Sequence, residues 1–520
     1  MDSIQKQPQP LQIDVNAPPR KKDPFSIDNL TTYLKYILSS CLTIAYVVYI
    51  LWGIWTGEAV LPVPPIANFL IFIFCLILVA YLEGLQVCIL AVEKYSPNKL
   101  RESHPRAYKL IKSVRTGNNV ERFLIGRQFF TIFVMTLMAQ VTSFPGISHL
   151  GINSIVWFIF IQTGLPGAIV VTTIGSLQPQ LLAARDPWKF LNLYGCNSVL
   201  QLCYGLEVSG ICTHFAWMLI AILRKTLFIS DSKPRSHEPE QTWTFYIVEG
   251  FKYLLSTVVL VSYCSYLMWG MWTGEAILPV PAIAVFLIYS GCILFLAFLE
   301  GLQVAMLVAE ESDLTPFAES KPRACALMKR ANTGKNVRRF LIGRQFFVIF
   351  IVFLINQCTI FPDISHLGIP DVIWFILVQL GLPTALNVLC FAQLPAQLLG
   401  NQDPMMFMNR PGPFFTLEVC LFTEMTGIAH FAWVATSISK ATWFQISPQC
   451  ALSPIKDPEA LSAPTSPIEP TTPIDKQSDQ LVYPASPYRA PHFDTEELQL
   501  SQHHDVRIYL NDNDDDNNGA

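Results

Sequence analysis

Charged residues are scarce in this chain of 520 residues: they make up 14% of it, while hydrophobic residues make up 52%. Soluble globular proteins carry about a quarter charged residues, so the composition argues against a water-soluble fold. The sequence instead contains apolar runs of about 20 residues. A helix of that length spans the hydrocarbon core of a bilayer. The runs predict an all-α integral membrane protein with about ten transmembrane helices in the lipid bilayer. They lie at 34–55, 66–92, 123–142, 154–182, 196–223, 253–272, 283–309, 340–360, 371–399 and 413–439.

Motifs of catalysis and metal binding are missing as well. The sequence has no Walker motif, no other Gly-rich phosphate loop and no nucleophile–base constellation, so it predicts neither an enzyme nor an ATP-driven pump. The 13 cysteines include no C-x-x-C pair and no Cys/His cluster at zinc spacing. We therefore expect no catalytic residue, no metal site, no cofactor and no nucleic-acid partner.

The chain contains an internal repeat. At an offset of 217 residues its two halves align without a gap over most of their length. The segment 117–130, for example, matches 334–347 at 12 of 14 positions. Because chance does not produce such agreement, the sequence predicts two copies of one five-helix unit. Repeated units are the usual architecture of secondary transporters, whose binding sites lie where the units meet.

Composition divides the chain into five parts. We expect membrane repeats at 34–223 and 247–445, joined by a linker at 224–246. Residues 1–33 are polar and Pro-rich and carry no visible signal sequence. Residues 446–520 are rich in Pro, Ser, Thr and Asp and cannot bury a core. Both terminal segments are therefore expected to be disordered and cytoplasmic, and the role of the tail stays open.

Two rules disagree about the orientation of the repeats. Five spans per repeat is an odd number, so we expect the second copy to be inverted relative to the first. The loops 93–122 and 309–339 are both strongly basic, however, and the positive-inside tendency places such loops on the same side. A parallel arrangement satisfies the charges if one apolar run per repeat is re-entrant. The Gly-Leu-Pro breaks at 164–166 and 381–383 make that alternative possible.

Polar residues recur inside the spans of both copies. An ionisable side chain near the bilayer centre costs about 2.5–3.5 kcal/mol on insertion scales. A functional role is therefore the first explanation for each such residue. A Glu-Gly-x-Gln motif late in the second span puts a carboxylate and an amide on one helix face. Its glycine is a point at which the helix can break. The motif supplies Glu83, Gly84 and Gln86 in one copy and Glu300, Gly301 and Gln303 in the other.

A second motif, Gly-Arg-Gln, lies early in the third span of each copy. Its arginine could snorkel to the headgroups, but the strict identity of the surrounding residues and the glycine before it favour close helix packing. A buried arginine and a buried glutamate also lower each other's cost. The motif supplies Gly126, Arg127 and Gln128, and then Gly343, Arg344 and Gln345. Candidates for coordinating a coupling cation are Glu83, Glu300, Glu207 and Glu424, the last two lying in the fifth span of each copy.

This ordered double occurrence of Glu-Gly-x-Gln and Gly-Arg-Gln resembles the silicon transporter family of diatoms and other silicifying eukaryotes. The resemblance covers about residues 30–445. It implies sodium-coupled uptake of silicic acid at the plasma membrane, with the twelve motif residues lining the substrate path. Diatom members often end in a long coiled coil, whereas the tail here lacks sustained heptads. Oligomerisation through the tail is therefore not expected, and the oligomeric state stays open.

The chemistry of the expected substrate suits these residue types. Silicic acid is a small uncharged tetrahedron of four hydroxyls, and carboxylate, guanidinium and amide groups together supply matching acceptors and donors. Two alternatives stay open at this point. One is a transporter of another small neutral hydroxylated solute, such as boric acid or a polyol. The other is a membrane scaffold or receptor that carries no solute.

Overall fold

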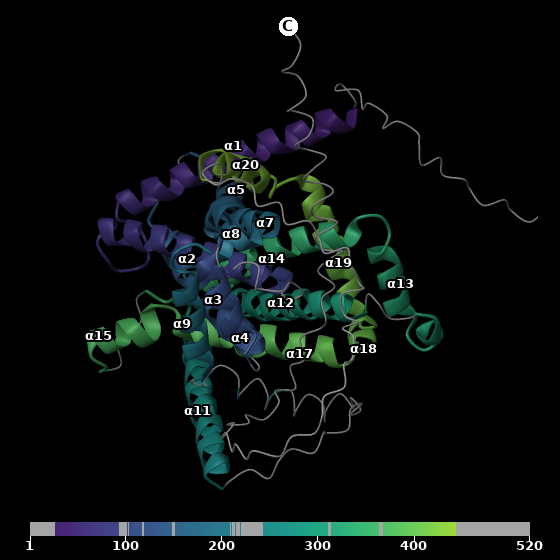
Figure 1. The fold of residues 1–520 in the computed structure, drawn as a ribbon. Coiled ribbons are helices and arrows are strands. Elements are labelled where there is room, and N and C mark those ends of the chain that lie inside the picture. The colour runs from purple at the N-terminus through teal and green to yellow at the C-terminus, as the bar shows by residue number, and fades with distance from the viewer. Residues whose placement is uncertain are drawn as a thin grey trace, which may run out of the picture.

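The computed structural model describes most of the membrane region as helices (Figure 1). Within the described residues every regular element is helical and no strand occurs. Eight helices there are long and apolar enough to cross a membrane, and a ninth candidate is a helix pair bent by 59°. The all-α membrane fold expected from composition is confirmed. The described ranges are 27–92, 101, 103–116, 119–147, 151–208, 210, 214, 219, 243–309, 314–362 and 368–443.

The first repeat contains four membrane-crossing candidates among its described residues, and one of them, Leu165–Arg185, consists of two α-helices joined by a π-helical segment. Two short helices, α3 and α8, lie outside these candidates, and each carries a lysine in its last turn. The elements are α1 Ile27–Trp55, α2 Pro65–Val92, α3 Pro105–Val114, α4 Asn119–Val141, α5 Ser154–Trp157, η2 Phe158–Gln162, α6 Leu165–Val170, η3 Val171–Leu177, α7 Gln178–Arg185, α8 Pro187–Leu191 and α9 Cys196–Val208.

The second repeat follows the same plan, and each of its helices that has a counterpart among the described residues of the first repeat begins close to 217 residues after it. The bent pair, α19 and α20, belongs to this repeat. The elements are α11 Trp243–Thr273, α12 Ala282–Ala309, η4 Thr315–Phe317, α13 Pro322–Ala331, α14 Asn336–Thr359, α15 Asp371–Trp374, η5 Phe375–Gln379, α16 Leu382–Asn387, η6 Val388–Gln393, α17 Leu394–Gln402, α18 Pro404–Met408, α19 Pro411–Thr426 and α20 Phe431–Trp443.

Nine of the ten predicted spans have a helical counterpart over most of their length. The predicted span 196–223 is described continuously only as far as α9 reaches, and most of its second half lies outside the described residues. The termini and most of the linker lie outside them too, so the domain boundaries placed there stay predictions.

The fourth span of each repeat is broken at a glycine. Gly164 and Gly381 adopt φ values of +82° and +87°, in the left-handed region where a side chain is strained. A proline follows two residues later, at the start of the next helix, because its missing N–H needs no partner there. The Gly-Leu-Pro triplets therefore mark the real helix breaks.

The two repeats pack against each other reciprocally. Gly164 of the first repeat lies against Gln357 of α14, and the equivalent Gly381 of the second lies against Gln140 of α4. Each repeat thus places its broken span on the third span of the other. Each copy therefore makes an equivalent contact with the other.

The ends of the helices show in which direction the repeats run. The first half of α1 lies at the break after α19, where the Ser39 hydroxyl donates to the carbonyl of Ile428 at 2.7 Å. The end of α19 adjoins the start of α14, where Glu424 pairs with Arg339 at 2.6 Å. The last turns of α1 instead pack on Phe144, just after the end of α4.

The helices α4 and α14 also lie together near their C-terminal ends. There the Gln357 amide donates to the Ser143 hydroxyl, and Asn356 contacts Thr136 at 3.4 Å. Consequently α1, α4 and α14 run in broadly the same direction. This favours the parallel alternative over the inverted orientation expected from five spans.

Candidate functional site

Two buried ion pairs join the sequence motifs. In the first repeat, Arg127 Nη1 lies 3.0 Å from a carboxylate oxygen of Glu83, and in the second, Arg344 Nη2 lies 2.7 Å from Glu300. All four residues are buried, with 2–8% of their surface exposed. Each pair links α2 to α4 or α12 to α14, because the glutamate and the arginine face each other across neighbouring helices. The arrangement lowers the cost of keeping either charge out of water.

A glutamine from the broken span binds the second oxygen of each carboxylate. The Gln180 amide donates to Glu83 at 2.6 Å, and the Gln397 amide donates to Glu300 at 2.7 Å. Both glutamines lie within a helix that follows a π-helical turn, α7 or α17. The broken span therefore contributes directly to the site.

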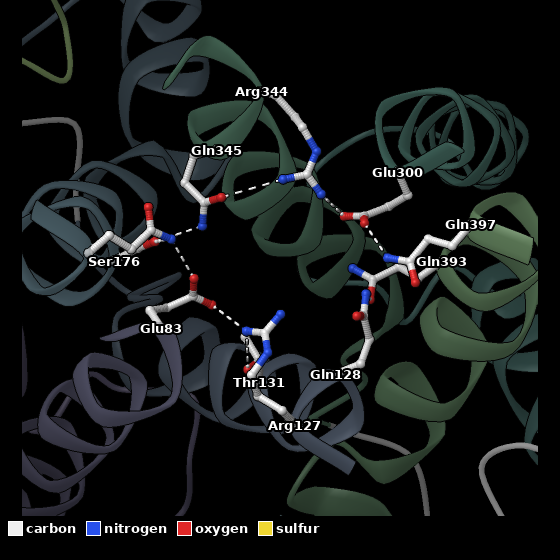
Figure 2. Close-up of polar contacts among 11 residues, drawn as sticks. Glu83, Arg127, Gln128, Thr131, Ser176, Glu300, Arg344, Gln345, Gln393 and Gln397 are labelled. Atoms are coloured by element: carbon white, nitrogen blue, oxygen red, sulfur yellow. Dashed lines mark hydrogen bonds and ion pairs between the residues drawn. The ribbon is translucent and has the colours of Figure 1, made fainter. Parts of the chain in front are cut away.

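Two further hydrogen bonds connect the repeats to each other. The Gln345 amide donates to the Ser176 hydroxyl, and the Gln128 amide donates to the side-chain oxygen of Gln393, both at 2.6 Å. Ser176 and Gln393 occupy equivalent positions in the two copies, as Gln128 and Gln345 do. The two hydrogen bonds are therefore equivalent contacts between the repeats. Figure 2 shows the two ion pairs and the amides arranged as a ring, with Glu83 and Glu300 on opposite sides.

The two arginines differ in how completely they are bonded. Arg344 Nε donates to the carbonyl of Leu299 at 3.2 Å, and Nη1 contacts Gln345 at 3.5 Å. Arg127 Nε is buried and has no hydrogen-bond partner among the described residues. Its Nη1 makes one further contact, to Thr131 at 3.5 Å. The first repeat thus offers a buried cationic donor that a ligand could satisfy.

The motif glycines allow close packing. A Cβ on Gly126 would lie 1.9 Å from the carbonyl oxygen of Cys203 in α9, and one on Gly343 would lie 2.0 Å from that of Cys420 in α19. These positions hold the third span against the fifth, main chain to main chain. The arginine that follows is therefore fixed in position by its glycine neighbour.

Gly84 and Gly301 do not break their helices, contrary to the interpretation drawn from sequence. Both α2 and α12 continue through them. A Cβ at either position would overlap an aromatic ring, Phe190 in the first repeat and Phe407 in the second. These glycines make room for a ring beside the glutamate, and the flexible points lie instead at the breaks in the fourth spans.

The remaining motif residues, Gln86 and Gln303, lie one helical turn beyond the glutamates. Both are half-buried, and neither amide makes a hydrogen bond within the part of the chain that the structure describes. They are not part of the bonded ring. Their role as substrate ligands stays a prediction.

Glu207 and Glu424 lie away from the ring. Each pairs with an arginine in the first turn of the third span: Glu207 with Arg122 at 2.8 Å and Glu424 with Arg339 at 2.6 Å. Their side chains are more exposed than those of the ring, at 24% and 15%. This pairing gives both carboxylates a structural partner, so the suggestion that they coordinate a cation has no support from their surroundings.

Four ring residues were not identified from sequence: Ser176, Gln180, Gln393 and Gln397. A signal for two of them was present, since Gln180 and Gln397 are 217 residues apart in an apolar run, as the motif residues are. Ser176 and Gln393 differ between the copies, so the repeat alone could not single them out.

The charges and hydrogen-bonding groups of the ring limit what it can bind. Two carboxylates and two guanidiniums leave it without net charge, while its amides and hydroxyl offer both donors and acceptors. Such a set suits a small neutral solute that is rich in hydroxyl groups. Within the described residues no group of three or more His, Cys, Asp or Glu side chains could hold a metal ion.

The comparisons with known proteins point in the same direction. A family model described as silicon transporter matches the chain twice, over residues 28–275 and 247–443, which together span both repeats. No curated protein and no solved structure matches the chain. The resemblance inferred from the two motifs is thereby confirmed.

Proposed function

Since the chain belongs to the silicon transporter family, we propose that it takes up silicic acid across the plasma membrane by sodium-coupled symport. The observation that carries the proposal is the neutral, buried ring of Glu83, Arg127, Glu300 and Arg344 at the contact between the repeats. Sites between repeats are where secondary transporters bind their solutes.

The substrate matches the ring in charge and in hydrogen bonding. Silicic acid is uncharged at neutral pH, and the ring has no net charge. The solute can therefore bind there without a counter-ion. Its four hydroxyls can donate to the carboxylates and accept from the arginine donors. The Nε of Arg127 is a buried donor without a partner among the described residues, so it is the ring donor that we expect the solute to satisfy. A site of this kind discriminates strongly, because an analogue lacking a hydroxyl leaves a buried polar group unpaired.

Coupling to an ion follows from the neutrality of the solute. The membrane potential does no work on an uncharged molecule, so its accumulation needs a co-transported cation. One cation moving down 100 mV releases about 2.3 kcal/mol, which supports a concentration ratio of roughly 40-fold. The plasma membrane is the membrane across which a sodium gradient can drive uptake into the cell.

A flux assay on the purified full chain in sealed vesicles tests the proposal. We expect silicic acid uptake when sodium is higher outside, and little uptake when choline replaces sodium. Germanic acid, a close tetrahedral mimic, should compete, whereas boric acid and a polyol should not. Flux without sodium dependence would remove the symport part, and no flux at all would favour a scaffold or receptor.

A matched pair of variants links the flux to the ring. Glu83→Gln removes a ring charge and should abolish uptake, because the guanidinium of Arg127 loses its partner. Glu207→Gln makes the same chemical change in an arginine-paired glutamate outside the ring and should retain uptake. Equal loss in both variants, at equal surface expression, would contradict a special role for the ring.

A further inference from the structure

A second buried polar cluster lies where the broken span of the second repeat meets the third spans. It consists of Thr136 on α4, Asn356 and Thr359 on α14, and Thr384 on α16. Their exposed fractions lie between 0% and 4%. Thr359 and Thr384 share a hydrogen bond of 2.8 Å, and Asn356 Nδ2 contacts the Thr136 hydroxyl at 3.4 Å. We refer to these four residues as the threonine–asparagine cluster.

The cluster sits at a helix break. Thr384 is three residues after Gly381, whose left-handed conformation ends the preceding helical segment. A Cβ at Gly381 would lie 2.3 Å from Thr136, which places the break directly against the cluster. Helix breaks inside membranes are the places where transporters expose main-chain carbonyls to ions.

The hydrogen-bond inventory shows a surplus of acceptors. Thr359 donates its proton to the carbonyl of Ile355 at 2.8 Å, so in the bond between the two threonines Thr384 must be the donor. The Thr384 oxygen then accepts from no described residue. The Asn356 side-chain oxygen is fully buried and likewise has no partner. Buried acceptors without donors are costly unless a ligand satisfies them.

The cluster occurs once, although the fold is duplicated. The residues 217 positions away are Phe353 for Thr136, Ala139 for Asn356 and Gly167 for Thr384, and only Thr359 has a polar counterpart. In the corresponding corner, the ring of Phe353 packs against Gly167. The corner at the second repeat's broken span therefore carries all four polar residues, whereas the corresponding corner keeps only Thr142, the counterpart of Thr359.

We propose that the threonine–asparagine cluster binds the coupling sodium ion, an assignment that rests on the proposed symport. Its ligands are the side-chain oxygens of Asn356, Thr384 and Thr359. Hard cations prefer such oxygen donors. The cluster has no carboxylate, which suits a monovalent ion better than a divalent one. The glutamates considered from sequence are each engaged with an arginine, which weakens their attraction for a cation.

Sodium binding can be measured without transport. The full chain is purified in detergent, and its melting temperature is compared in sodium chloride and in choline chloride. We expect sodium to raise the melting temperature of the wild type, because a ligand that binds the native state stabilises it. Asn356→Ala, which installs the residue of the first repeat, should abolish this rise. Thr384→Ala should reduce it strongly.

Asn387→Val is the matched control, since it also replaces a buried asparagine by its first-repeat counterpart. The oxygen of Asn387 already accepts from Cys264 at 3.1 Å, so this variant should keep the sodium-induced rise. A rise that persists in Asn356→Ala, or one that is lost equally in all three variants, would overturn the assignment. For each variant we compare the melting temperature in sodium chloride with that in choline chloride, so a change in basal stability cancels.

The same samples separate this assignment from the proposed transport function. Silicic acid should raise the melting temperature of Asn356→Ala in choline as it does for the wild type, because the ring is intact. Stabilisation by silicic acid together with no sodium effect in any protein would overturn the sodium site and leave silicic acid binding standing. Stabilisation by sodium but not by silicic acid would refute the substrate and leave the site.

Discussion

The two ring arginines should differ in their contribution to stability, although their motifs are identical. Replacing Arg344 by Met leaves Glu300 buried without its counter-charge, and breaking a buried pair in this way costs about 3–5 kcal/mol. The same argument applies to Arg127 and Glu83. Arg344, however, also donates to the carbonyl of Leu299.

That extra bond sets the expected difference. A hydrogen bond to a charged group contributes about 1.5–3 kcal/mol, and the Nε atom of Arg127 has no such partner to lose. Arg344→Met should therefore be more destabilising than Arg127→Met by about that amount. Adding Glu300→Gln to the Arg344→Met variant should recover part of the loss, because no uncompensated charge then stays buried.

Thermal unfolding of the detergent-solubilised protein, followed by fluorescence-detected gel filtration, gives the order of the midpoints. The expected order from highest to lowest is wild type, Arg127→Met, Arg344→Met, with the double variant above the single Arg344→Met. A lower midpoint for Arg127→Met than for Arg344→Met would refute the reasoning from the hydrogen bonds. A double variant as unstable as the single would show that the buried charge is not the cause.

Three other predictions concern the packing, the ring and the orientation. Gly126→Ala should abolish folded expression, since its Cβ would overlap a main-chain carbonyl, whereas Gly205→Ala, with nothing within 4 Å, should express normally; both are measured by gel filtration. Gln393→Ser, which installs the residue of the first repeat, should weaken silicic acid uptake several-fold at normal expression, because its cross-repeat partner loses an acceptor. Cysteines at the equivalent exposed positions Lys109 and Ala326 should be labelled from the same side of intact cells; labelling from opposite sides would restore the inverted orientation.

The sequence predicted the helical membrane fold because its evidence is compositional: long apolar runs need no knowledge of contacts. It also predicted the glutamate and arginine of each ring pair, since charged residues inside apolar runs are conspicuous. Their pairing across helices follows from the cost of isolated charge, and the structure shows it at 3.0 Å for Glu83 with Arg127.

Other features depended on packing that a sequence does not display. Gly84 was interpreted as a weak point of α2, yet it makes room for the ring of Phe190, a residue more than 100 positions away. Ser176 entered the ring only through a contact from the other repeat. The inverted orientation was expected from five simple crossings per repeat, but the fifth apolar run of the second repeat is a pair of helices bent by 59°, which its sequence does not display.

The cross-repeat bonds of the ring have a consequence for biosynthesis. Glu83 and Arg127 belong to the same repeat, so they can neutralise each other as soon as the fourth helix, α4, leaves the ribosome. The amide of Gln128 must wait for Gln393, which is made more than 250 residues later. The buried charges, which are costly without a partner, are therefore paired early in synthesis. The Gln128 amide, whose burial without a partner costs less, stays unpaired until the second repeat is made. A chain that ends between the repeats would therefore contain the Glu83–Arg127 ion pair, but its Gln128 amide would lack the acceptor that the second repeat provides.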